Sequence, residues 1–99
     1  MKIPKELIFS GRKIKVEKCS PESIKMRGYN GRAIYDLGLI LLANDMGEGM
    51  EARVFLEEVL HCILSEAGFE EESKDEKLVQ TISSGVFSII RNNKLDFNK

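Results

Sequence analysis

Histidine is the scarcest reactive residue in this chain of 99 residues, because His61 is the only one. A metal site or a catalytic triad that needs a second histidine is therefore excluded. Cysteine is also rare, with only Cys19 and Cys62, and residues 1–5 lack the apolar stretch of a signal peptide. We expect free thiols in a reducing compartment, the cytoplasm.

The chain also has no long hydrophobic run and no excess of either charge. Its apolar runs fall far short of the roughly 18 residues that a membrane span requires, so we predict no membrane partner. Fifteen basic and sixteen acidic residues give a net charge of −1, which predicts no nucleic-acid partner. The composition is that of a soluble globular protein, and we expect residues 1–99 to form one domain of unknown oligomeric state.

The first half of the chain has the pattern of β-strands. Residues 7–9 and 12–17 flank a Ser-Gly pair, which predicts a β-hairpin. A turn over 28–31 precedes two more predicted strands, 32–36 and 39–43. The last of these is apolar throughout, so we expect it at the centre of the sheet.

The second half has helical periodicity. Apolar residues recur at helical spacing over 50–67, and Gly68 is well placed to end that helix. Ser73 and Glu76 have the spacing of a capping box, which predicts a second helix over 73–92. The predicted fold class is α+β: a small, mostly antiparallel sheet of three to four strands packed on two long C-terminal helices, the first of them central.

A polar stripe follows the first predicted helix. Glu57 and His61 lie one turn apart and are neighbours on the helix surface, and Glu58 projects to the same side. Residues 57–61 match the H-E-x-x-H pattern of zinc peptidases in spacing, glutamate and second histidine, but Glu57 replaces the first histidine. By composition and periodicity alone, a solvated helix face with a surface Glu57–His61 pair explains this stripe.

The order of these segments resembles that of the small metallopeptidase-like proteins of phages and prophages that are related to the ImmA/IrrE metallopeptidases. The resemblance covers most of the chain: the N-terminal hairpin, the segment Gly31-Arg32-Ala33-Ile34-Tyr35-Asp36, the apolar strand, the motif helix, an acidic connector, and a closing helix that ends in Arg91-Asn92-Asn93. It implies a minimal zincin-like core in which the edge of the strand over 39–43 holds an extended peptide.

The resemblance also implies site residues. Glu57, His61 and Gln80 stand where the family has its metal ligands, and Glu58 stands where it has its general base. Two of the three ligands are altered, and a neutral amide oxygen is a poor ligand for zinc. We therefore expect no cofactor and predict a catalytically degenerate module that binds a peptide or protein. The alternative is an atypical peptidase that holds zinc or another divalent metal through those three residues, with Glu58 as the base.

Two other features have simple structural explanations. Cys62 follows His61 directly and points about 100° away on a helix, toward the apolar side, which predicts a buried structural thiol. The acidic residues over 70–76 are expected to form a solvated connector with a helix cap.

Overall fold

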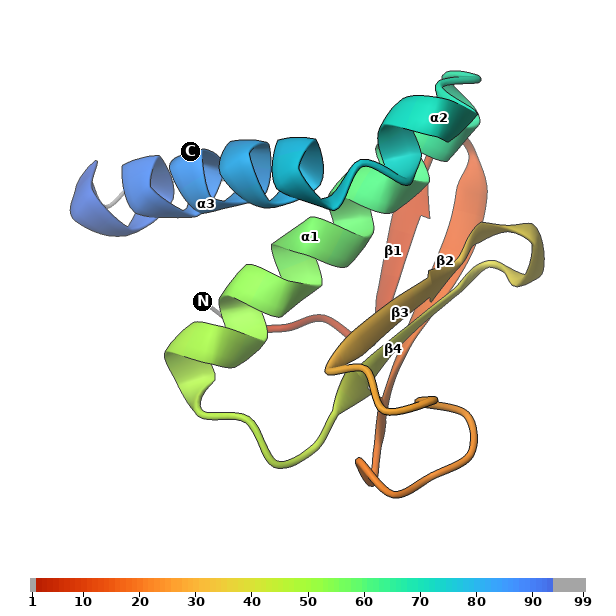
Figure 1. Ribbon diagram of the computed structural model, residues 1–99, viewed down its shortest axis with the longest axis vertical. Coiled ribbons are helices and arrows are strands. Elements are labelled where there is room, and N and C mark those ends of the chain that lie inside the picture. Colours follow the sequence, from red (N-terminus) through yellow and green to blue (C-terminus); the bar gives the residue numbers. More distant parts are fainter. Residues whose placement is uncertain (1, 94–99) are drawn as a thin grey trace.

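A computed structural model describes residues 2–93 as three layers: a four-stranded sheet, helix α1 across one of its faces, and helix α3 packed on α1 (Figure 1). The elements in chain order are β1 (Glu6–Phe9), β2 (Arg12–Cys19), β3 (Gly31–Ile34), the 3-10 helix η1 (Tyr35–Leu37), β4 (Leu39–Ala43), α1 (Glu48–Glu66), α2 (Glu70–Ser73) and α3 (Glu76–Asn93). This arrangement confirms the α+β class, two long helices after the strands, and the central place of the first helix.

The sheet has the strand order β1-β2-β4-β3. Both hairpins, β1–β2 and β3–β4, are antiparallel as predicted, whereas the central strands β2 and β4 run parallel. The parallel pair arises because residues 20–30 carry the chain past β4 before β3 begins. Met26 of that segment is fully buried against Leu41 and Ala43, on the sheet face opposite α1.

The predicted first hairpin is confirmed, and its turn explains the Ser-Gly pair. Ser10 and Gly11 have φ angles of 53° and 74°. Positive φ at both central residues is typical of the type I′ turn, whose twist matches that of the flanking strands. The predicted apolar strand is also confirmed in its position, because β4 has a neighbour on each side.

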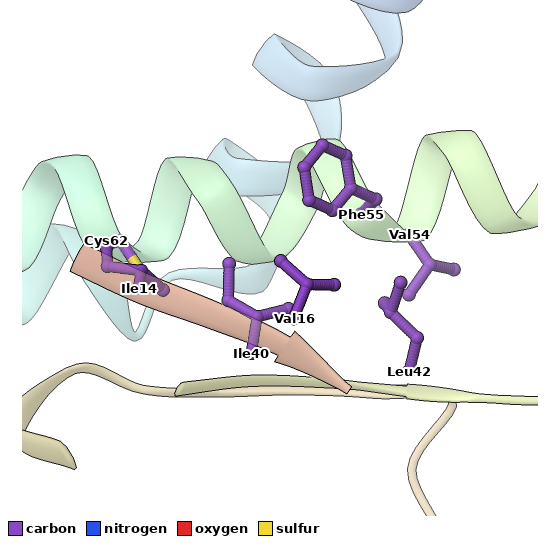
Figure 2. Packing of buried hydrophobic residues seen from close by; sticks show 7 residues of the cluster. All are labelled: Ile14, Val16, Ile40, Leu42, Val54, Phe55 and Cys62. Carbon is purple, nitrogen blue, oxygen red and sulfur yellow. The ribbon is translucent and has the colours of Figure 1, made fainter. Parts of the chain in front are cut away.

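The main core lies between α1 and the sheet (Figure 2). Its buried members are Ile14, Val16, Ile40, Leu42, Val54, Phe55 and Cys62. Cys62 is 2% exposed within this apolar cluster, and the burial raises the pKa of its thiol to about 11. The prediction of a buried structural cysteine is confirmed. Both cysteines are free thiols.

The boundary between the two long helices differs from the prediction. Residues 70–73 form the short helix α2, and α3 begins only at Glu76. Asp75 caps α3, since its side-chain oxygen accepts a hydrogen bond from the Leu78 backbone N–H at 3.1 Å. The capping box at Ser73 and Glu76 is therefore wrong, because the aspartate that precedes the helix takes the capping position.

Across residues 2–93, no helix combines the length and the hydropathy needed to cross a membrane.

Candidate functional site

A cleft of about 700 Å³ opens beside α1. Its walls come from β3, from one side of α1 and from the start of α3. All four predicted site residues line it, together with two small residues of β3: Glu57, Glu58, His61, Gln80, Gly31 and Ala33. The structure thus brings the predicted residues together, while their roles stay predictions.

The strand that borders the cleft is not the one expected. β4 is paired on both sides, with β2 and β3, so it has no free edge for a peptide. β3 is the edge strand, and its residues 31–33 line the cleft. The expectation that the strand over 39–43 presents its edge to a peptide is therefore wrong, because its very apolarity places it in the middle of the sheet.

The register of β3 shows which of its backbone groups are free. The Ala43 N–H donates to the Asn30 carbonyl at 2.9 Å, and the register continues antiparallel from there. Hydrogen-bonded and non-hydrogen-bonded pairs alternate along such a ladder. Arg32 and Ile34 consequently direct their N–H and C=O groups to β4, and Gly31 and Ala33 direct theirs outward.

Glu58 is the only buried acidic residue in the part of the chain described, with 7% of its surface exposed. It lies directly under β3: a Cβ atom built on Gly31 would stand 3.0 Å from its Oε2. Its carboxyl group forms no hydrogen bond or ion pair within residues 2–93. Its oxygens reach the open cleft, because no fully buried side-chain oxygen in this part of the chain lacks a hydrogen-bond partner. Desolvation, together with the charges of Glu57 and Glu76, raises the pKa of Glu58 to about 8.

His61 is held from the α2 side of the cleft. Its Nδ1 lies 3.3 Å from the Ser73 hydroxyl, which donates in turn to the His61 carbonyl oxygen at 3.3 Å. Its Nε2 lies 3.4 Å from Oε1 of Glu76, the first residue of α3. The imidazole therefore bridges α1 to the segment that follows it.

Glu57 lies one turn before His61 on the cleft wall. Partial burial raises its pKa, and the charge of Arg53 opposes that change. Among residues 2–93, no lysine or arginine nitrogen comes within 4.0 Å of its carboxylate. Gln80, on the second turn of α3, is exposed at the cleft mouth.

Within residues 2–93, no group of three or more histidine, cysteine, aspartate or glutamate side chains is arranged to hold a metal. Gln80 could add only a neutral amide oxygen, which is a weak donor for zinc. The cleft is a polar groove with the carboxyl group of Glu58 in its floor.

The sequence analysis missed Ser73 and Glu76. Both were assigned to a helix cap in a solvated connector, whereas Ser73 is buried and Glu76 faces His61. Their S-x-x-E spacing is typical of a capping box and gives no indication of a contact with His61. Asp75 is a preferred N-cap residue and directly precedes a helical segment, so the sequence offered a second candidate for the cap besides Ser73.

Comparisons with known proteins do not assign this site to a family. No family model matches the chain, and neither the curated proteins nor the solved structures give a significant match.

Proposed function

We propose that this protein is a binding module that holds an extended peptide, or an extended segment of a partner protein, in the cleft along the free edge of β3. The peptide adds a strand to the sheet and hydrogen-bonds to the outward backbone groups of Gly31 and Ala33. The family resemblance of the sequence supports this proposal, since it describes a peptidase-type cleft of phage or prophage origin with altered metal ligands.

The observation that carries the proposal is the coincidence of a free strand edge with a cleft. An edge strand is a template for pairing with another chain, and most edges are protected by charge, twist or a covering element. The β3 edge instead faces an open cavity with polar walls. Backbone pairing supplies affinity in such sites, and the walls supply selectivity for side chains.

Binding of this kind requires no metal. The outward N–H and C=O groups of β3 act as donors and acceptors by themselves, and His61 is already held by Ser73 and Glu76. The peptidase alternative instead requires a cation held by Glu57, His61 and Gln80. Elemental analysis and zinc or manganese titration test it separately: a stoichiometric metal that is lost in His61→Ala would support the peptidase.

Ala33→Pro tests the strand-addition step. Proline removes only the outward N–H of Ala33, leaves the ladder to β4 intact, and is tolerated on edge strands in this orientation. We expect the variant to keep its thermal stability within a few degrees and to lose peptide binding. The readout is the fluorescence polarisation of labelled extended peptides selected from a display library against the wild-type protein.

Ile8→Pro is the matched control, because Ile8 occupies the equivalent outward position on the other edge strand, β1. The Val16 N–H donates to the Lys5 carbonyl, which places the N–H of Ile8 on the free side. This variant should bind the selected peptides like the wild type. Equal binding by Ala33→Pro and Ile8→Pro, or no selected peptide at all, would refute strand addition at β3.

A further inference from the structure

We infer that the cleft selects peptides with a lysine or arginine in the position beside Gly31, whose cationic group is held by Glu58 with Glu57 and Glu76 around it. This inference rests on the proposed function and names the chemistry of its ligand. It starts from Glu58, a residue that is more than nine-tenths buried and whose carboxyl group has no partner within residues 2–93 and faces the floor of the cleft.

The geometry of β3 directs a peptide side chain to this carboxyl group. Residues that lie opposite each other on paired strands project to the same face of the sheet. The Cβ position of Gly31 points toward Val54 and Glu58 of α1. The peptide residue beside Gly31 therefore projects toward α1 as well, and Gly31 has no side chain of its own to stand in the way.

Acidic groups surround the path of that side chain. Glu57 lies beside Glu58 on α1, and Glu76 enters from α3 with its side chain 63% exposed. Both raise the pKa of Glu58, so both act on it through space. A lysine or arginine side chain is long enough to reach the recessed carboxyl group of Glu58, and its positive charge is attracted by all three glutamates.

The two arginines that line the cleft, Arg32 and Arg53, form no ion pair with Glu58. Arg32 donates from Nη1 to the Lys25 carbonyl at 2.6 Å, which turns its guanidinium toward the 20–30 segment. Arg53 is exposed, and its charge lowers the pKa of Glu57. Neither arginine forms an ion pair within 4.0 Å in the described part of the chain. No lysine or arginine nitrogen of residues 2–93 therefore lies within 4.0 Å of the Glu58 carboxyl group, although the charge of Arg32 acts on it at longer range.

The test compares four versions of one peptide selected on the wild-type protein, with lysine, arginine, methionine or glutamate at the position beside Gly31. Methionine matches lysine in length and lacks its charge. We expect lysine and arginine to bind at least about tenfold more tightly than methionine, and glutamate to bind weakest.

Glu58→Gln should reduce the preference for lysine over methionine to near one, whereas Glu66→Gln, an exposed substitution on the same helix, should keep it. Equal binding of the lysine and methionine peptides by the wild type would refute the inference while leaving strand addition intact. Absence of peptide binding with every side chain would refute the proposed function itself. Full lysine preference in a folded Glu58→Gln protein would show that Glu58 does not hold the cation.

Discussion

The two edge strands of the sheet, β1 and β3, offer the same backbone chemistry in opposite surroundings. On β1 the side chains alternate between exposed and half-buried, and the outward residue Ile8 is 74% exposed. On β3 every residue is half-buried, and a cleft with a buried carboxyl group lies along the strand. Only β3 therefore combines free hydrogen-bonding groups with walls that can select a ligand.

The two edges differ in the charged residues that lie next to each strand. β2, which pairs with β1, exposes Lys13 and Lys15 to solvent. Glu58 lies beneath β3 instead, close to Gly31, which has no side chain to stand between the strand and the carboxyl group. A buried carboxyl group without a partner lowers stability when it ionises, and such groups concentrate at functional sites. The β3 side of the molecule therefore has a group that costs stability next to the proposed binding surface, and the β1 side has no such group within residues 2–93.

The largest expected effect is on the pH dependence of stability. The pKa of Glu58 is about 8 in the folded protein and about 4.5 in the unfolded chain, so folding takes up a proton between these values. The free energy of unfolding should fall as pH rises from about 4.5 to 8, by up to about 5 kcal/mol. Urea denaturation across this pH range measures it. Glu58→Gln should flatten the slope, whereas Glu6→Gln on the exposed β1 strand should preserve it.

The next largest effect is expected from a side chain at Gly31. A Cβ atom there would stand 2.6 Å from Cγ1 of Val54, which real contacts essentially never show. Gly31→Val should therefore lower the free energy of unfolding by about 2–3 kcal/mol, as overpacking does. Chemical denaturation at fixed pH measures this loss. An unchanged stability would mean that β3 can move away from α1, and the close cover of Glu58 by this strand would be wrong.

A smaller effect is expected from Ser73→Ala, which removes the hydroxyl that holds His61 from the α2 side. The hydrogen bonds are long, at 3.3 Å, so we expect a loss of about 1 kcal/mol and a changed chemical shift of the His61 ring in NMR spectra. Ser84→Ala, at an exposed position of α3, should change neither quantity. Identical His61 signals in both variants would contradict the positioning role of Ser73.

The smallest effect is expected on the β1 edge. Ile8→Thr keeps β-branching and changes a side chain that is already 74% exposed, so stability should stay within about 0.5 kcal/mol of the wild type. Peptide binding should also be unaffected. A fall in binding would place part of the ligand on β1 and would remove the contrast between the two edges.

Much of the fold could be predicted because it follows from short-range patterns. The Ser-Gly turn, the apolar strand and the period of the first helix depend on residues within a few positions of one another. The 3-10 helix η1 was missed, and the predicted strand over 32–36 is shorter, since β3 ends at Ile34. Element ends depend on long-range pairing as well as on local preference, and β3 stops where its register with β4 ends at Leu39.

The candidate site could be predicted only in part, for the same reason. Glu57, Glu58 and His61 share one helix, so their spacing alone places them near each other. Gln80 was located through the family resemblance, and the structure places it at the cleft mouth. Ser73 and Glu76 approach His61 across a chain reversal, and no spacing rule describes that contact.

The sequence by itself determined the order of the four strands and the two long helices, the apolarity of β4 and the polar stripe on α1. Only the tertiary structure decided that β3 would be the free edge, that Glu58 would lie buried beneath Gly31, and that Glu76 would face His61. Periodicity is a local property of the chain, whereas strand order and the burial of a charge depend on how distant segments pack together.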